Sequence, residues 1–301
     1  MMTVQAAYDL FLEDRRSYCA FRTLETYHCG ILLFFRWLEG HFGQPVSCLP
    51  LCQEENIYRG YILHLRENGT RPVTIRSYCR SIAAFLRWCY ENDLCGDYLK
   101  GVKLPKSDAR PKLPLYRDEM ERIDSLFDMD TIQGIRNYCI VHFMADCGLR
   151  TQEVVHLQRG DIMPERNLLQ VLDSKGNKNR LVLVPGFLLE AVSRYCSMAG
   201  IQEGFLFRSL KGNAPITGNT VRQLFGSLKK QSGIERLHAH LLRHTFATSY
   251  LMGGGNLEFL RVFMGHTDYA VTQAYSRMAA EYKMLGADIY RLDDIFFTRG
   301  Y

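Results

Sequence analysis

Apolar residues recur at helical spacing through the first hundred residues of the chain. The spacing predicts four helices, over residues 3–18, 23–40, 54–68 and 73–92. In the last of these, Arg76, Arg80 and Arg87 fall on one face, and the opposite face is apolar. This part of the chain therefore predicts a small helical domain that carries one basic helix face.

The second half of the chain mixes helical periodicity with two short runs that favour β-strands. Helical patterns cover residues 117–127, 131–146, 187–199 and 217–231. The β-rich runs, 168–172 and 180–184, are separated by the turn-forming sequence DSKGNKN. Two such runs around one turn predict a β-hairpin within an otherwise helical domain.

The segment between the two halves is rich in proline. Residues 101–114 hold three prolines and four basic residues and show almost no apolar periodicity, which is typical of a linker. Its basic charge suits a path near phosphates, and an inert spacer fits it equally well. We expect a mainly α protein with a small antiparallel β-sheet and two domains: helical at 1–102, linker at 103–114, and mixed α/β at 115–301.

Composition and charge narrow the class of protein. A length of 301 residues with 47% hydrophobic residues favours two domains. The formal net charge is +5, and the first hundred residues hold 11 basic and 11 acidic residues, so the excess lies after them. A net charge this small does not by itself indicate nucleic-acid binding, so that inference depends on how the charges are distributed.

The cysteines and the N-terminal sequence point to a reducing compartment. The ten cysteines form no C-x-x-C pair, and the N-terminus lacks a basic segment ahead of an apolar one. The most apolar run, residues 31–38, is far shorter than the roughly 20 residues of a membrane span. We expect a cytoplasmic protein with reduced cysteines and no zinc site built from them.

The residues best suited to chemistry lie between 237 and 278. His240 and Arg243 form an H-x-x-R motif on one helical turn, His266 follows a glycine, and Tyr275 comes nine residues later. A guanidinium group is suited to clamp a phosphodiester, and a phenol with a pKa near ~10 needs such a charged pocket to attack phosphorus. The resulting phosphotyrosine would keep the bond energy, so a second DNA hydroxyl could reverse the step without ATP.

Glycines and an asparagine set the helix ends in this region. Three glycines, 253–255, end the helix that carries Arg243, because glycine gives up too much backbone entropy to extend it. Asn256 is suited to cap a new helix that runs to Gly265. His266 then stands just beyond a helix C-terminus, where a side chain can turn into a cleft.

Two further motifs lie upstream. Arg150 follows Gly-Leu and is followed three residues later by Glu153, and Lys175 lies in the predicted hairpin turn. Together with the downstream motifs they resemble the tyrosine recombinase family, which includes phage integrases and Xer-like resolvases. The resemblance spans nearly the whole chain, although Phe263-Met264 and Ser174 depart from the more usual residues. It implies a catalytic domain at 115–301 and a helical core-binding (SAM-like) domain at 1–102.

The resemblance also implies a role for each motif residue. Arg150 and Arg243 would clamp the phosphate, Tyr275 would attack it, and Lys175 would protonate the leaving 5′ oxygen. His240 would act as an acid, base or hydrogen-bond donor, His266 as a further donor, and Glu153 would orient the pocket. Two arginines and a lysine supply the positive charge that a metal ion would otherwise supply, so we expect neither a metal nor a cofactor.

Double-stranded DNA is the expected partner. On the N-terminal helix face we expect groove or phosphate contacts from Arg71, Thr74, Arg76 and Arg80. Around the hairpin we expect phosphate contacts from Lys178 and Arg180. An ordinary solvated charged face is the alternative explanation for the N-terminal set.

An apolar stripe at the end of the chain predicts a last helix. Leu285, Ile289, Leu292 and Phe296 recur at helical spacing, although Gly286 weakens the helix. The stripe either packs on its own domain or, as the resemblance implies, docks in trans within a tetramer on DNA. Truncation after Arg277 would then abolish cooperative assembly and spare the binding of one monomer.

We expect a site-specific recombinase that works through a 3′-phosphotyrosine, as the integrase or transposase of a mobile genetic element. No separate arm-binding domain is evident, which favours action at core sites. The alternatives are a Xer-like resolvase of chromosome or plasmid dimers, a type IB topoisomerase-like enzyme, and a silent DNA-binding regulator. An accessory DNA-bending factor is a further possible partner.

Overall fold

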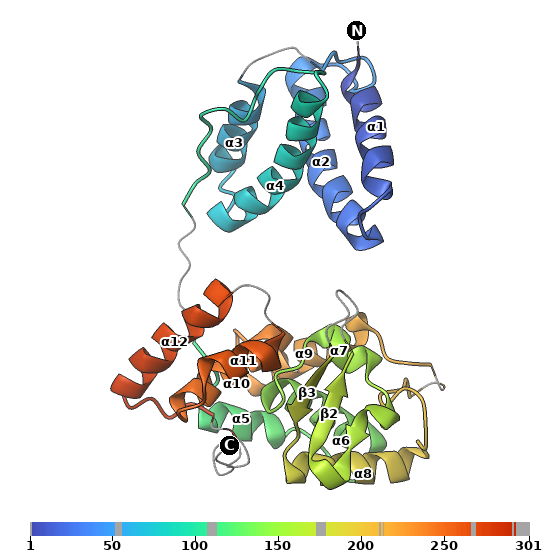
Figure 1. Ribbon diagram of the computed structural model, residues 1–301, viewed down its shortest axis with the longest axis vertical. Coiled ribbons are helices and arrows are strands. Elements are labelled where there is room, and N and C mark those ends of the chain that lie inside the picture. Colours follow the sequence, from blue (N-terminus) through green and yellow to red (C-terminus); the bar gives the residue numbers. More distant parts are fainter. Residues whose placement is uncertain are drawn as a thin grey trace. The chain divides into compact units, whose positions relative to one another are not determined.

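A computed structural model describes residues 2–51, 56–106, 113–172, 179–210, 212, 214–265, 269–290 and 292 (Figure 1). The chain forms two compact units, Met1–Arg110 and Pro111–Tyr301, and their boundary falls within the predicted linker. The fold is mainly helical with one small antiparallel sheet, as expected. No helix in the described ranges is long and apolar enough to cross a membrane.

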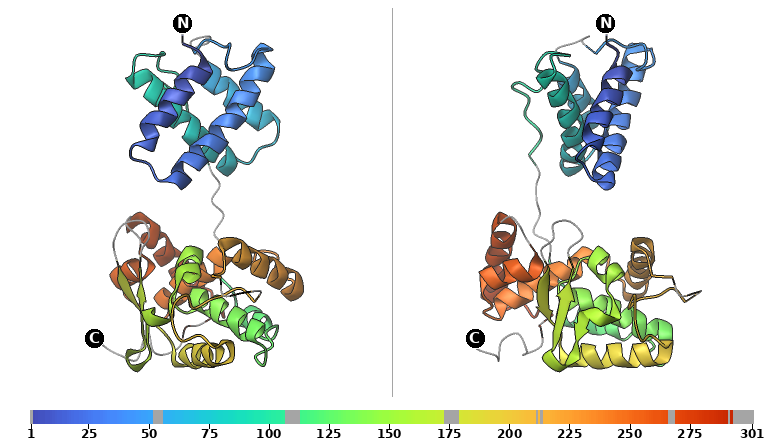
Figure 2. Two further views of the ribbon diagram at one scale, coloured as in Figure 1. Left: turned by 90° about the vertical axis from the view of Figure 1, so that its right-hand side faces the viewer. Right: turned by 45° about the vertical axis from the view of Figure 1, so that its right-hand side comes forward.

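The four helices in the described part of the first unit form a bundle, which Figure 2 shows. They are α1 (Val4–Arg16), α2 (Phe21–Phe42), α3 (Ile57–Glu67) and α4 (Pro72–Glu91). Local sequence sets their ends: the Thr3 hydroxyl caps α1, and Pro72 begins α4 at a position where its missing N–H costs nothing. Phe11, Phe34 and Phe85 are fully buried among edge-to-face rings, so aromatic packing holds the bundle together.

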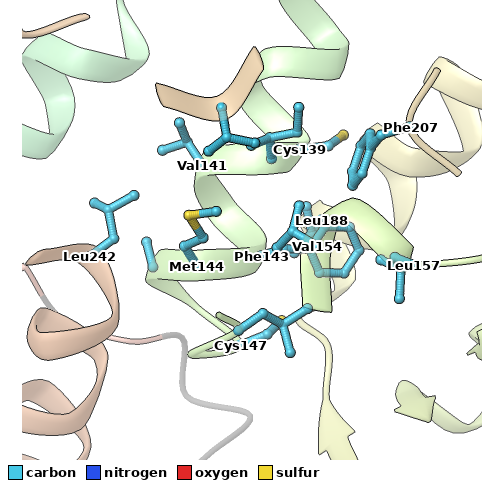
Figure 3. Packing of buried hydrophobic residues seen from close by; sticks show 14 of the residues in the cluster. Cys139, Val141, Phe143, Met144, Cys147, Val154, Leu157, Leu188, Phe207 and Leu242 are labelled. Atoms are coloured by element: carbon cyan, nitrogen blue, oxygen red, sulfur yellow. The ribbon is translucent and has the colours of Figure 1, made fainter. Parts of the chain in front are cut away.

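The second unit surrounds a buried helix. Its helices are α5 (Arg117–Asp124), α6 (Ile132–Ala145), α7 (Thr151–His156), α8 (Gly186–Ala199), α9 (Gly218–Ser232), α10 (Ala239–Met252), α11 (Leu257–Met264) and α12 (Tyr269–Met284), with short 3₁₀ turns at Arg159–Asp161 and Pro164–Arg166. Helix α6 is buried along most of its length and packs against both α8 and α10. Figure 3 shows Met144 of α6 on the side of Leu242 of α10, with Leu188 and Phe207 on the other side.

A three-stranded antiparallel sheet in the order β1-β2-β3 covers part of this unit. Its strands are β1 (Ile162–Met163), β2 (Leu168–Val171) and β3 (Arg180–Leu183). Val171 lies opposite Arg180, and both are buried, whereas Leu181 is half exposed. The inward face of β3 therefore carries an arginine, and this places Arg180 inside the second unit.

A buried histidine ties α5, α6 and the end of the described chain together. The His142 ring lies 2.7 Å from an Asp146 carboxylate oxygen and 3.0 Å from an Asp124 oxygen. The Tyr290 hydroxyl donates to the other Asp146 oxygen at 2.8 Å. Because both ring nitrogens face carboxylates, the protonated imidazolium satisfies the pair best, and the pKa of His142 is raised to about 9 although burial opposes this.

The predicted C-terminal helix is wrong over its described part. Helix α12 ends at Met284, and Gly286 turns the chain with a left-handed φ of +62°. The next residues are extended: Ile289 forms a bridge with Tyr116, and the Tyr290 N–H donates to the Leu115 carbonyl. The spacing of apolar residues misled because Ile289 is buried from an extended segment, and Leu292, which is also buried, is not in a helix. Phe296 lies outside the described residues.

Candidate active site

Arg150 stands at the start of α7, where the local sequence fixes its backbone. Glu153 accepts the main-chain N–H of Arg150 at 2.7 Å and the side-chain Nη1 at 3.0 Å, so it acts as the capping carboxylate of the helix. Gly148, two residues earlier, has a φ of +63° and lies against Phe246, where a Cβ would come within 2.6 Å of the ring. The Gly-Leu-Arg sequence therefore sets the direction in which Arg150 leaves the backbone.

Arg243 is buried on α10 and is held by main-chain oxygens. One end of its guanidinium donates to the Gly148 carbonyl and the other to the Met264 carbonyl. Only 5% of the residue is exposed. Burial and the charge of Arg150 lower the pKa of Arg243 to about 9; Arg180 adds to this effect, and Glu153 and Tyr275 oppose it. Arg243 therefore interacts electrostatically with each of the other groups of the site: Arg150, Glu153, Arg180 and Tyr275.

Arg180 and Glu153 form a buried bidentate pair. The guanidinium donates to the two Glu153 oxygens at 2.8 and 2.9 Å, and its Nε donates to the Phe263 carbonyl at 2.6 Å. Burial acts to raise the pKa of Glu153, but the hydrogen bonds and charge of Arg180, aided by the Arg150 N–H and by Arg243, lower it overall. Glu153 is therefore an ionised carboxylate among three guanidinium groups.

Tyr275 lies on α12, which packs against α10. Its ring centroid is 5.2 Å from that of His244, which is itself buried. Burial raises the pKa of the Tyr275 phenol, and the charge of Arg243 lowers it in part. The tyrosine and the arginine thus interact electrostatically, although they come from separate helices.

The other predicted residues are placed as follows. His240 lies in the first turn of α10 and is exposed, whereas Arg243 one turn later is buried. Lys175, Lys178 and His266 lie outside the described residues. Within those ranges, no group of three or more His, Cys, Asp or Glu residues is arranged to hold a metal ion.

The predicted DNA-contacting residues of the first unit share one helix. Arg76 and Arg80 are exposed on α4, Thr74 is half-buried in its first turn, and Arg71 precedes the helix and is exposed. The basic face expected from the sequence is present, and its contact with DNA stays a prediction.

Arg180 needs a different interpretation from the one its sequence suggested. We expected it to contact phosphate, but its side chain is only 5% exposed and its hydrogen bonds go to Glu153 and Phe263. The signal was hidden because RLVLV is apolar at both alternating positions, so the pattern does not show which face is inward. His244, a residue that the sequence motifs do not single out, is the ring that packs on Tyr275.

The chain is similar in sequence to known tyrosine recombinases. The tyrosine recombinase XerC of Staphylococcus haemolyticus is 27% identical over 286 residues, 93% of each chain. The tyrosine recombinase XerC of Bacillus licheniformis is 29% identical over 239 residues, 74% of this chain and 76% of the relative.

Solved structures share the fold. The Tn1549 transposon integrase in complex with a circular intermediate DNA matches with a TM-score of 0.74 at 20% identity, over 95% of this chain and 100% of that one. A lambda integrase dimer bound to a core site matches with a TM-score of 0.72 at 16% identity, over 91% and 95% of the two chains. The model of the phage integrase family matches residues 115–281, which is more than half of the chain. The chain therefore belongs to the phage integrase family of tyrosine recombinases.

Proposed function

We propose that this protein is a site-specific recombinase that cuts and rejoins DNA with Tyr275 as the nucleophile. The observation that carries the proposal is geometric: Arg150 and Arg243 donate to the adjacent carbonyls of Gly265 and Met264. The Tyr275 ring lies 5.2 Å from that of His244, the residue after Arg243. Among the described residues of this site, three guanidinium groups surround one carboxylate, and a phosphodiester would balance their excess of positive charge. Relatives named tyrosine recombinases, similar over 93% of the chain, support the same activity.

The reaction conserves a phosphodiester at each step. The Tyr275 oxygen forms a bond to phosphorus while the bond from phosphorus to the 5′ oxygen breaks, which leaves a 3′-phosphotyrosine and a 5′ hydroxyl. Attack by a 5′ hydroxyl on this intermediate reverses the step and releases the tyrosine. Arg150 and Arg243 would stabilise the charge on the non-bridging oxygens, so the protein's own residues supply the positive charge.

Proton transfer completes the mechanism. Lys175 would protonate the leaving 5′ oxygen, and His240 would accept the phenol proton or donate a hydrogen bond to the phosphate. His266 would donate to a further non-bridging oxygen, and Glu153 would orient Arg150. For His240, exposure on the first turn of α10 is compatible with contact to a DNA strand that lies over the site.

The physiological role is the finer part of the proposal. We predicted a mobile-element integrase from the sequence, whereas the similar relatives are named XerC and favour a Xer-like resolvase. The location of the target separates the two: a site beside the protein's own gene favours a mobile element, and a single site elsewhere on the chromosome favours a resolvase. A topoisomerase-like enzyme would relax DNA without joining two sites.

Covalent capture tests the proposed chemistry. Fragments of the genomic DNA that encodes the protein would first be selected by their binding to it. Nicked duplexes of the selected fragments would then be incubated with the protein in EDTA. We expect a protein–DNA adduct on a denaturing gel and none from Tyr275→Phe. Tyr269→Phe, a matched change at an exposed position of the same helix, should form the adduct normally. Binding without any adduct would instead identify a silent DNA-binding regulator.

Assembly on DNA is a further proposal. A tetramer with the C-terminal segment docked in trans, and an accessory bending factor, follow from the family resemblance. In the structure, Ile289 and Leu292 pack in their own domain, so truncation after Arg277 would also remove part of that packing. Truncation after Leu292 is the cleaner test: it should abolish cooperative assembly on paired sites and spare monomer binding in a gel-shift assay. Unchanged cooperativity would rule out docking by the removed residues.

A further inference from the structure

The C-terminal end of α11 is held by three arginines from three different elements. The carbonyl of Phe263 accepts from Arg180, that of Met264 from Arg243, and that of Gly265 from Arg150 at 2.9 Å. Carbonyls at a helix C-terminus lack partners within the helix and lie at the negative end of its dipole, so cations are favoured there. The next residue in the sequence is His266, which connects this helix end to the proposed chemistry.

Gly265 lets the guanidinium groups approach this closely. It caps α11 with a left-handed φ of +58°, and a Cβ at this position would lie 3.2 Å from Nη1 of Arg150 and 3.4 Å from Nη1 of Arg180. The glycine before His266 is therefore part of the packing that joins α11 to the arginines.

Arg180 has different surroundings from Arg150. The Arg150 side chain is 34% exposed, so it can reach a phosphate, whereas the Arg180 side chain is 5% exposed. The Arg180 guanidinium uses all three of its nitrogens on Glu153 and Phe263. From its position on β3, the Arg180 side chain forms directional hydrogen bonds to the capping carboxylate of α7 and to the end of α11.

We propose that Arg180 is a positioning residue for DNA cleavage. It shares Glu153 with Arg150, and it anchors the end of α11 through Phe263. The site would then keep one geometry before DNA binds, with the Arg150 side chain held between Glu153 and the Gly265 carbonyl and still one-third exposed for contact with the phosphate. This inference rests on the proposed function of the site.

The sharing of Glu153 explains why a positioning role is needed. The carboxylate accepts two hydrogen bonds from Arg180 and two from Arg150, one of them from the Arg150 backbone. Without Arg180, the buried Glu153 would lose two of these four hydrogen bonds, and it would draw the Arg150 side chain more strongly toward itself and away from the substrate. Lysine at this position would keep the charge but would not form the planar fork.

Single-turnover cleavage measured beside DNA affinity tests the proposal. At saturating protein, we expect Arg180→Lys and Arg180→Met to cleave a nicked duplex about 100-fold more slowly, the size of effect that a small misplacement produces. The Kd for DNA should stay the same. Arg180→Lys should melt closer to the native protein than Arg180→Met does, because it still neutralises Glu153. Arg194→Met, which breaks an exposed pair with Asp130 in the same unit, should change neither rate nor affinity.

The outcomes separate positioning from plain stability. If Arg180→Lys cleaves at the native rate, the fork is unnecessary and the proposal is overturned. It is also overturned if the loss of rate in the two variants simply follows their loss of thermal stability. A slow Arg180→Lys variant with nearly native stability and affinity supports the proposal.

An NMR measurement keeps this inference independent of the proposed activity. In protein labelled with ¹⁵N-arginine, the Nε–Hε signal of Arg150, assigned with Arg150→Lys, should move in Arg180→Lys and stay in place in Arg194→Met. If the native protein binds DNA but forms no adduct, the proposed function fails. In that case an Arg150 signal that still moves would retain the positioning role, and an unmoved signal would overturn it.

Discussion

The two units of the protein use arginine in opposite ways. On α4 of the first unit, Arg76 and Arg80 are exposed on one helix face. In the second unit, Arg180 and Arg243 are buried and have their hydrogen-bond partners before any DNA is present. An exposed arginine adds a small, salt-screened attraction to phosphate, whereas a buried one supplies a fixed charge of much greater strength. The first arrangement suits binding and the second suits chemistry.

The buried arrangement has a cost in stability that the surrounding main chain reduces. Taking a guanidinium group out of water is unfavourable unless its donors are satisfied. In this unit the carbonyls of Gly148, Phe263, Met264 and Gly265 accept from the arginines, and Glu153 supplies a negative charge to two of them. The comparison shows that, among the described residues, main-chain carbonyls of the second unit stabilise a group of buried arginines that a bound anion would complement.

The largest effect on the cleavage rate should come from a conservative substitution of the buried Arg243. Arg243→Lys keeps a positive charge but cannot reach the Gly148 and Met264 carbonyls together. We expect single-turnover cleavage to fall about 10³-fold, the size of effect typical of losing one preorganised donor to a transition state. Rapid-quench measurement of adduct formation at saturating protein would give the rate.

The same substitution on the exposed face is the matched control. Arg76→Lys should leave the cleavage rate at saturation unchanged, because Arg76 is solvent-exposed and acts, on our proposal, only in binding. If Arg76→Lys slowed cleavage as much as Arg243→Lys does, the division of labour between the two units would be incorrect.

Much of this division was predictable from the sequence. The basic face of α4 follows from helical spacing, and Asn256 and Gly265 mark the ends of α11 where they were expected. These features depend on local rules of periodicity and capping, which a single sequence carries. The Gly-Leu-Arg and H-x-x-R motifs likewise identify the arginines that meet at the site.

The contacts that depend on the tertiary structure were not predictable. Arg180 reads as one more basic residue near a turn, because its burial depends on which side of β3 faces the core. The stripe from Leu285 to Leu292 has helical spacing, yet hydrogen bonds from the Tyr290 and Arg117 N–H groups draw the segment into an extended pairing with residues 115–117. In the C-terminal segment tertiary hydrogen bonds override local propensity, whereas at Arg180 the predicted strand is present and only its inward face was undetermined.

A second, smaller effect concerns the stability of the fold, to which a buried histidine between two carboxylates contributes. His142 lies between Asp124 and Asp146, with Tyr290 beside them, and its pKa is raised to about 9 in the folded protein. Because an unfolded histidine titrates near ~6.5, this stabilisation is fully present below that pH and is lost as the pH rises through about 9. The shift corresponds to roughly 3 kcal/mol of unfolding free energy.

Urea unfolding as a function of pH would measure this contribution. The native protein should lose stability between about pH 6.5 and 9, and His142→Gln, although less stable overall, should show a flatter dependence over that range. His156→Gln, at an exposed histidine of the same unit, should keep the native slope. An unchanged slope in His142→Gln would mean that His142 is not the buried cation that titrates.

The smallest effect is expected on the exposed side of the comparison. Replacing Arg76 and Arg80 by alanine should weaken DNA binding about tenfold at physiological salt and leave the cleavage rate at saturation unchanged. If both contact phosphates, the slope of log K against log salt should become shallower by about 0.9 for each arginine removed. Fluorescence anisotropy over a salt series would give both numbers. Arg36→Ala, at an exposed arginine of α2, is the control: if it changes the slope as much as a single α4 substitution, the first unit attracts DNA through its general charge, and α4 has no special place in binding.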